Sequence, residues 1–245
     1  MEMPVEFRFG DVTWHASAAS FPRAEAWLQR HFLSIFDRVD SLLKKDTGSR
    51  VAAADGFVIK ESTARRGRSG VRFGMRRSGS LRAFRLGVEL TRLGVRTPRP
   101  VAWATVRRLG IRMRDFLITE HVCAASSLSA RFEECRRHAE NRKRLMEALG
   151  HLLASFHVQG YSNRDLKDTN VLAGGDDGRE LWAVDLDGVR RIRITRRRAI
   201  KDLWPIVRSL KMHGMGDAND KQNILNGYNS LSTLGLRMEE LPGNY

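Results

Sequence analysis

Apolar residues in the first half of the chain occur in short runs that are typical of β-strands. Six such runs are residues 5–9, 12–14, 51–54, 57–60, 101–106 and 116–122. The second pair of runs flanks Asp55-Gly56, and an Asp-Gly pair between two apolar runs is a strong hairpin signal. The last two runs are separated by a loop around Gly110. These patterns predict a small antiparallel sheet.

Two stretches of the first half have helical spacing instead. Residues 22–39 place apolar side chains at intervals of three and four, with Pro22 near the start. Residues 81–93 do the same, with Ser80 as a candidate N-terminal cap. Residues 44–50 are interpreted as a polar turn, and the Arg/Gly/Ser-rich residues 63–80 as a loop. As a whole, the first half is predicted to be strands with one long inserted helix.

The second half has mainly helical patterns. Residues 141–158 carry one apolar face, formed by Leu145, Met146, Leu149, Leu152, Leu153 and Phe156. Residues 181–184 predict a short buried strand that ends at Asp185. Residues 196–211 predict a helix in which Pro205 should cause a kink or a boundary. The last 30 residues are expected to hold one short helix at most.

Candidate chemistry is concentrated in residues 161–170, between the helical pattern and the short strand. Asp165 could orient a hydroxyl group or accept its proton, and Lys167 could neutralise charge on a transferred phosphoryl group. Asn170, five residues after Asp165, and Asp185, at the strand end, are oxygen donors suited to Mg²⁺. These residues are the parts of a phosphoryl-transfer site.

Upstream residues could supply the nucleotide half of such a site. Lys60 closes an apolar strand, where it could contact phosphates, and Glu89 is the only acidic residue between Glu61 and Asp115. Glu89 is therefore the candidate partner of Lys60. Glu120 and Val122, at the end of a later strand, could give backbone hydrogen bonds to adenine.

Composition narrows the class of protein. The 245 residues are 42% hydrophobic and 29% charged, and they suit one large domain or two small lobes. No apolar run is long enough to span a bilayer, and the first six residues do not resemble a secretory signal. We therefore interpret Cys123 and Cys135 as free thiols of a cytosolic protein. The net charge of +15 indicates an anionic partner, without choosing among nucleic acid, membrane and phosphorylated substrate.

The motifs occur in an order that resembles the protein-kinase-like superfamily. They are Lys60, Glu89, Asn163-Arg164-Asp165-Leu166-Lys167-Asp168-Thr169-Asn170 and Asp185-Leu186-Asp187, within residues 50–210. Within the superfamily, the chain most resembles bacterial lipopolysaccharide kinases, which phosphorylate Kdo or heptose sugars of the lipid A core. The features that carry this resemblance are Leu-Leu-Ala-Ser-Phe-His-Val-Gln-Gly at 152–160, Val-Asp-Leu-Asp-Gly-Val-Arg at 184–190 and Gly-Val-Arg-Thr-Pro-Arg-Pro at 94–100.

The resemblance implies an α+β, bilobal, protein-kinase-like fold, with an N-terminal lobe at 1–120 and a helical lobe at 121–245. It implies Asp165 as catalytic base, Asn170 and Asp185 as Mg²⁺ ligands, Lys60 at the ATP phosphates and Asp202 as a brace beneath the catalytic loop. The chain departs from the superfamily at Asn163, where His is usual, and at Asp187, where Gly is usual. No Gly-x-Gly-x-x-Gly precedes Lys60.

The implied function is a lipopolysaccharide-core sugar kinase, a transferase that uses ATP and Mg²⁺. Its acceptor would be an anionic glycolipid, and the enzyme would be cytoplasmic and peripheral on the inner face of the cytoplasmic membrane. Two arginine-rich segments, 65–82 and 190–201, would bind the acceptor's anionic groups and anionic lipid headgroups. A protein Ser/Thr kinase and an aminoglycoside-type or choline-type phosphotransferase are alternatives. A basic nucleic-acid-binding module is the non-enzymatic alternative, but the basic runs lack interleaved aromatic residues, so no nucleic acid is expected.

Overall fold

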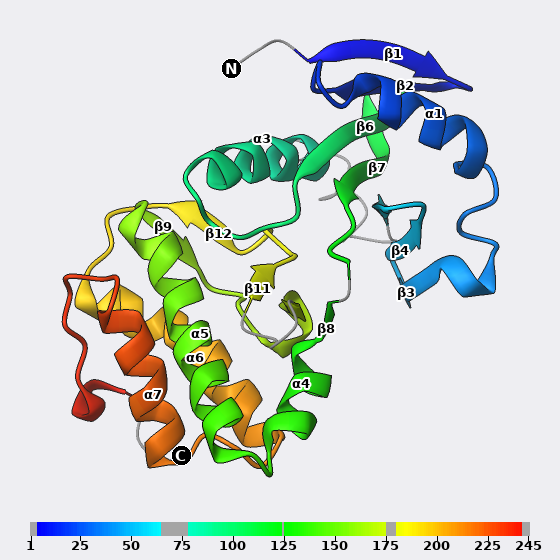
Figure 1. Ribbon diagram of the computed structural model, residues 1–245. Helices are drawn as coiled ribbons and strands as arrows, with labels where there is room; N and C mark the ends of the chain where they lie inside the picture. The colour runs from blue at the N-terminus through cyan, green and yellow to red at the C-terminus, as the bar shows by residue number, and fades with distance from the viewer. Residues whose placement is uncertain (1–3, 65–77, 124, 175–179, 242–245) are drawn as a thin grey trace. The chain divides into compact units, whose positions relative to one another are not determined.

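The computed structural model describes residues 4–64, 78–123, 125–174 and 180–241, and its chain forms two compact units (Figure 1). The first unit comprises residues 1–89 and 98–121 and contains the main sheet. The second comprises residues 90–97 and 122–245 and contains most of the helices. We call them the sheet unit and the helical unit.

The sheet unit is built on seven antiparallel strands in the order β1-β2-β6-β7-β5-β4-β3. The strands are β1 (Val5–Phe9), β2 (Val12–Ala16), β3 (Leu42–Asp46), β4 (Ser49–Ala54), β5 (Phe57–Thr63), β6 (Pro100–Arg108) and β7 (Ile111–Glu120). The six predicted strands are confirmed, including the hairpin that turns at Asp55-Gly56. The predicted antiparallel sheet is therefore correct.

The polar turn predicted at 44–50 is wrong, because most of it is strand. Lys44 and Lys45 belong to β3, which pairs with β4 at one edge of the sheet, and only Thr47 and Gly48 form the turn. An edge strand commonly carries charged side chains, which prevent pairing with another chain. Such a strand has no apolar alternation by which it could be recognised.

The helix predicted at 22–39 is shorter in the structure, where α1 is Phe21–His31. Turns follow it, yet Phe32, Ile35 and Phe36 still pack against the core. The prediction was too long because residues that follow the helix are also apolar, since they too pack against the core. Trp27 of α1 is buried, and its indole N–H donates to the carbonyl of Ala54 at 2.8 Å. The sheet unit thus contains α1, within the segment predicted to be helical, as well as the inserted helix.

The inserted helix is α3 (Gly79–Arg92), and its start is held by β7. Asp115 of β7 is buried and accepts the backbone N–H of Gly79 at 2.9 Å. A carboxylate at this position also complements the positive end of the helix dipole. The hydroxyl of Ser78 accepts the N–H of Leu81 at 3.1 Å, so Ser78 caps the helix and the prediction of Ser80 is wrong. Residues 65–77 of the predicted 63–80 loop lie outside the described residues.

The helical unit contains α4 (Leu128–Cys135), α5 (Ala139–Val158), α6 (Arg196–Met212) and α7 (Ala218–Asn229). The six apolar residues predicted on one face of α5 are all buried. α4 was not predicted. α6 runs continuously through Pro205, so the boundary considered there is absent. No helix among the described residues is long and apolar enough to cross a membrane.

The short strands of the helical unit frame the candidate site. They are β8 (Ser126–Ser127), β9 (Tyr161–Asn163), β10 (Val171–Gly174), β11 (Glu180–Ala183) and β12 (Val189–Arg191). β10 pairs with β11 and β8, and β9 pairs with β12. The segment after α3 is also fixed here, because the Thr97 hydroxyl donates to the carbonyl of Ala183 at 2.8 Å.

Three further features complete the fold. Single-turn helices are η1 (Val39–Ser41), η2 (Asp168–Asn170) and η3 (Met238–Glu240). α5 and α7 pack closely: a Cβ at Gly150 or Gly227 would overlap the backbone of the other helix. Cys123 and Cys135, both among the described residues, form no disulfide, in agreement with the predicted thiols.

Candidate active site

The candidate catalytic loop runs from β9 to β10 and contains η2. Val171 of β10 pairs with Ala183 of β11. The residues just beyond that pair, Asn170 and Val184, are joined by a 3.0 Å hydrogen bond from the Val184 N–H to the Asn170 carbonyl. Asp185 is the next residue. The register of one short hairpin thus brings the two predicted metal ligands to the same end.

The structure also brings Asp165, Lys167 and Asn170 together. The Lys167 ammonium lies 3.2 Å from one Asp165 carboxylate oxygen, and the Asn170 amide nitrogen lies 3.0 Å from the other. That nitrogen also donates to the Asp165 carbonyl at 2.8 Å. The Asp165 side chain remains 42% exposed, so a substrate hydroxyl could reach it.

The backbone before Asp165 is held by Asn163, where the superfamily usually has His. Asn163 is buried, and its side-chain oxygen accepts the Asp165 N–H at 3.1 Å. An asparagine can therefore fix the start of this loop through its amide oxygen.

Gly188 was not predicted as a site residue, but it lies directly against Asp165. A Cβ at position 188 would come within 2.7 Å of the Asp165 Cβ and 3.1 Å of its backbone nitrogen. The β12–β9 register, in which Val189 faces Asn163, produces this contact. Glycine is required here for the close approach. The Asp-Gly pair at 187–188 was the available sequence signal.

The oxygen donors near Asn170 fit a magnesium ion. Asp185 is half-buried and accepts the N–H of Asp187 at 3.0 Å, whereas Asp187 is exposed. Because the Asn170 nitrogen donates to Asp165, its amide oxygen points elsewhere and could join Asp185 in binding a cation. Oxygen ligands and few protein donors are typical of Mg²⁺. Among the described residues, no cluster of three His, Cys, Asp or Glu side chains forms a separate metal site.

Asp168 anchors the loop and was not singled out from the sequence. Its carboxylate accepts hydrogen bonds from Ser129 of α4 at 2.9 Å and Ser209 of α6 at 3.2 Å, and lies 3.0 Å from the His213 imidazole. Burial raises the pKa of Asp168, but hydrogen bonds from His213, Ser129, the Thr169 backbone and Ser209 outweigh it, so the pKa is lowered.

Asp202 braces the start of the loop through other side chains. It is fully buried on α6, 3.2 Å from the His157 imidazole and 3.3 Å from the Arg198 guanidinium. Arg198 donates to the Ser162 hydroxyl at 2.6 and 2.8 Å. The Tyr228 hydroxyl lies 2.7 Å from the other His157 nitrogen, and burial raises the pKa of Tyr228 to about 12. The predicted brace therefore reaches the loop through Arg198.

The predicted nucleotide residues belong mainly to the sheet unit. Phe57, Ile59 and Glu61 of β5 are buried, and alternation along the strand places Lys60 on the opposite face. Glu61 is paired with Arg50 and with Arg114, the latter at 2.6 Å. Glu61, the buried neighbour of Lys60 in sequence, therefore already has two cationic partners.

Glu89 and Glu120 occupy the predicted elements. Glu89 is half-buried near the end of α3, and its pairing with Lys60 stays a prediction. The backbone N–H groups of Glu120 and His121 donate to the carbonyls of Arg99 and Gly56, each at 2.9 Å. The adenine contacts expected at Glu120 and Val122 stay a prediction.

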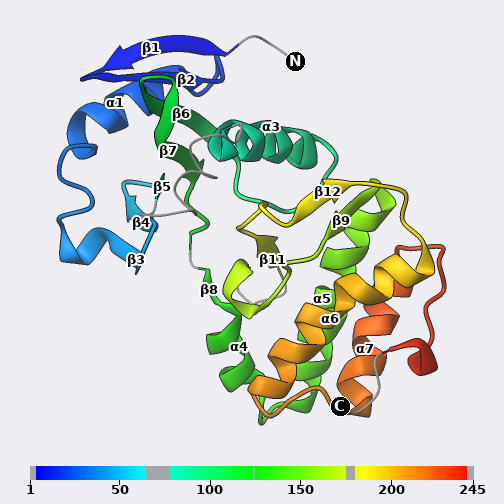
Figure 2. The same cartoon turned by 180° about the vertical axis from the view of Figure 1, so that it is seen from behind.

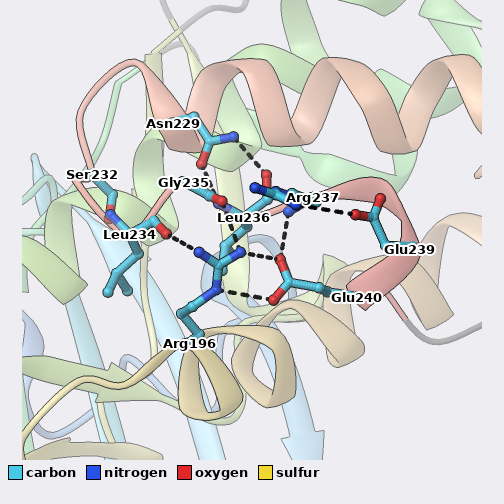
Figure 3. Close-up of polar contacts among 9 residues, drawn as sticks. All are labelled: Arg196, Asn229, Ser232, Leu234, Gly235, Leu236, Arg237, Glu239 and Glu240. Atoms are coloured by element: carbon cyan, nitrogen blue, oxygen red, sulfur yellow. Dashed lines mark hydrogen bonds and ion pairs between the residues drawn. The ribbon is translucent and has the colours of Figure 1, made fainter.

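The second arginine-rich segment contains arginines of two kinds. Arg196 forms a bidentate pair with Glu240 at 2.6 and 3.0 Å and donates to the carbonyls of Leu234 and Gly235 (Figure 3). It therefore fastens the C-terminal segment to the start of α6. Arg193 and Arg197 are exposed. Most of the first arginine-rich segment lies outside the described residues.

Comparison with known proteins identifies the family and supports the fold. The model of the lipopolysaccharide kinase (Kdo/WaaP) family matches residues 47–228. A solved structure of WaaP in complex with acyl carrier protein aligns with a TM-score of 0.58 and 21% identity, over 89% of this chain and 88% of that one. The predicted bilobal kinase-like α+β fold is confirmed by this likeness.

Curated relatives agree with the family match. A 3-deoxy-D-manno-octulosonic acid kinase of Xanthomonas euvesicatoria pv. vesicatoria (strain 85-10) is 36% identical over 149 residues, 60% of this chain and 56% of the relative. The same enzyme of Xylella fastidiosa (strain 9a5c) is 32% identical over 138 residues, 56% of this chain and 52% of the relative. The chain spans a little over half the length of these relatives. It belongs to the lipopolysaccharide kinase (Kdo/WaaP) family.

Proposed function

We propose that this protein is an ATP-dependent kinase that transfers the γ-phosphate to a sugar hydroxyl of the lipopolysaccharide inner core, on Kdo or heptose. One observation carries the proposal: in a member of this family, Asp165, Lys167 and Asn170 converge within hydrogen-bonding distance. The curated relatives that match over half their length are kinases of Kdo.

Asp165 is the catalytic base in this proposal. Its exposed carboxylate orients the acceptor hydroxyl and takes its proton as the oxygen attacks the γ-phosphorus. Lys167 neutralises negative charge on the phosphoryl group during transfer. In the free protein this lysine pairs with Asp165, so the substrate phosphate would compete with the carboxylate for the ammonium.

Asn170 and Asp185 would hold Mg²⁺, and the ion would neutralise charge on the ATP phosphates. The Val184–Asn170 hydrogen bond supports this pairing, because it aligns the two donors. Asp185 is favoured over Asp187, since it directly follows β11 and is the less exposed of the two.

The nucleotide would be bound by residues before Asp165. Lys60 contacts its phosphates and is oriented by Glu89. The Glu120 carbonyl and the Val122 N–H bind the adenine edge. In this arrangement residues 1–120 act as the nucleotide-binding lobe and residues 121–245 as the catalytic lobe.

The acceptor would be an anionic glycolipid of the lipid A core, reached from the cytoplasmic side of the membrane. The net charge of +15 supports an acceptor rich in phosphate and carboxylate, and arginine binds such groups bidentately. We therefore place the protein in the cytoplasm, in peripheral contact with the inner face of the cytoplasmic membrane. Cationic drug or choline acceptors are a poorer electrostatic match.

A transfer assay with radiolabelled ATP tests the proposal. Purified protein is supplied with Kdo-lipid A, a heptose-containing core glycolipid, a peptide mixture or an aminoglycoside, with and without Mg²⁺. We expect label on a glycolipid and none without the metal. Label on peptide or aminoglycoside alone would contradict the proposal. An Asp165→Ala sample controls for contaminating kinases.

A further inference from the structure

Helix α6 has two faces of opposite character. One is buried and consists of Ala199, Asp202, Leu203, Ile206, Val207, Ser209 and Leu210. The other is exposed and carries four cations, Arg197, Lys201, Arg208 and Lys211. Their spacings of four, seven and three residues place them in one line along a helix with 3.6 residues per turn. We call these four residues the basic stripe.

The charge of the basic stripe is not balanced within the described residues. Asp202 is the one acidic residue of α6, and it is fully buried. Arg196 and Arg198 flank the stripe and have internal partners, Glu240 and Asp202. None of the four stripe residues forms an ion pair with a described carboxylate.

The N-terminal position of Arg197 adds a further cost. A cation in the first turn of a helix opposes the helix dipole. Arg197 lies in that turn and, unlike Arg196 and Arg198, contacts no carboxylate among the described residues. An external anion would offset both the dipole and the repulsion within the stripe.

Apolar side chains lie between these cations. Ile200 and Trp204 are half-buried on the same side of α6, and Met212 at its end is 75% exposed. Cations that alternate with tryptophan and aliphatic side chains are typical of a helix that lies in the headgroup region of a bilayer. The 17 residues of α6 span about 25 Å, enough to contact several headgroups. Figure 2 shows α6 along the outside of the helical unit, in front of α5.

We propose that the exposed face of α6 is a membrane-docking surface that binds the headgroups of anionic phospholipids. The inference rests on the proposed function, since a glycolipid kinase must work at a membrane. Lipid is favoured over nucleic acid because nucleic-acid phosphates would contact only the cations. A bilayer would accommodate the cations at its headgroups and also the exposed parts of Trp204 and Met212.

The docking surface leaves the catalytic loop accessible. The loop contacts α6 at Arg198, Ser209 and the following His213. These positions lie roughly a third of a turn around the helix from the basic stripe. α6 therefore holds the loop on one side while another side meets the membrane.

Vesicle flotation tests the surface without requiring catalysis. The full chain is mixed with phosphatidylcholine vesicles, with or without 30% phosphatidylglycerol. A stripe variant replaces Arg197, Lys201, Arg208 and Lys211 with Gln. A control variant makes the same replacement at four other exposed cations, Arg38, Arg108, Arg137 and Lys143. Circular dichroism and thermal unfolding check that both variants fold.

We expect the wild-type protein to float only with the anionic vesicles. Each cation near an anionic surface contributes about fivefold to binding, so the loss of all four should weaken binding by about 600-fold. The control variant should lose less than about fivefold. Equal losses of vesicle affinity in both variants would mean that only the net charge matters, and would overturn the proposal. Binding of the stripe variant at the wild-type affinity would also overturn it.

A second measurement covers the case in which the stripe variant does not fold. Anionic vesicles with brominated acyl chains should quench tryptophan fluorescence in the wild-type protein, and Trp204→Phe should remove most of that quenching. Quenching that is unchanged by Trp204→Phe would overturn the proposal. So would stripe-dependent binding to duplex DNA without binding to vesicles. A kinase that fails to float would refute the docking surface alone, whereas a protein that floats but transfers no phosphate would refute the proposed activity alone.

Discussion

The two halves of the candidate catalytic loop differ in how they are held. Around Asp165 the carboxylate is 42% exposed, and its side-chain partners, Lys167 and Asn170, come from the same loop. Around Asp168 the carboxylate is 14% exposed, and its partners come from α4, from α6 and from the segment after α6. A reacting group must be reachable by substrate, whereas an anchor must be fixed by the rest of the fold.

The anchors at both ends of the loop come from one helix. Arg198 near the start of α6 holds Ser162, and Ser209 near its end holds Asp168. Asp165 lies between these two fixed points. The loop can therefore present an accessible carboxylate without losing its position.

The largest expected effect comes from the accessible half. Asp165→Asn keeps the shape of the side chain but removes the base, and loss of general-base catalysis should lower kcat by roughly 10²–10⁴-fold. Because the side chain is exposed, the free energy of unfolding should change by less than about 1 kcal/mol. Steady-state kinetics and urea unfolding measure the two quantities. A variant that turns over at the wild-type rate would show that Asp165 is not the base.

A smaller loss should follow from a change beside Asp165. Gly188→Ala would push a methyl group to within 2.7 Å of the Asp165 Cβ, so the carboxylate must shift. Misplacement of a catalytic group on this scale should lower kcat roughly 10–100-fold, with little change in the Kd of ATP.

The matched control for that variant is Gly79→Ala. A Cβ at Gly79 would meet only ordinary contacts, the nearest at 3.6 Å from Asp115, so it should leave kcat unchanged. If the two substitutions changed kcat equally, Gly188 would not be needed to position Asp165.

The sequence revealed the accessible half of the loop better than the anchored half. Asp165, Lys167 and Asn170 stand in one short motif, and a local motif is visible without the fold. Asp168 was adjacent to them, but its partners Ser129 and His213 are distant in sequence and carry no motif. Long-range polar contacts of this kind depend on tertiary packing.

The same distinction explains the errors in the fold. The apolar hairpins and the α5 face were predicted because periodicity records burial. The edge strand β3 has no such apolar periodicity, since Lys44 and Lys45 are exposed. The cap of α3 was misplaced from Ser78 to Ser80, because the choice depends on Asp115, a residue 37 positions away from Ser78.

The anchored half should respond in stability. Asp168→Asn keeps the volume but weakens charge-assisted hydrogen bonds from Ser129, Ser209 and His213, which should cost about 1–3 kcal/mol of unfolding free energy. Urea unfolding at pH 7 measures the loss. The affinity for ATP should hardly change. A stability equal to that of the wild type, with kcat reduced as far as in Asp165→Asn, would reverse the roles assigned to the two aspartates.

The smallest expected effect is the pH dependence of that anchor. The pKa of Asp168 is lowered in the folded protein, so its contribution to stability is present above the ordinary Asp value of about 3.9 and is lost as the pH falls through the folded value. The wild-type protein is compared with Asp168→Asn at each pH, with the hydrogen bond partner His213 left in place in both. The difference in unfolding free energy between the two proteins should be constant from pH 7 to pH 5 and shrink towards pH 3. A difference that persists undiminished at pH 3 would mean that the ionised carboxylate is not what anchors the loop, and that the hydrogen-bonding geometry of the side chain suffices.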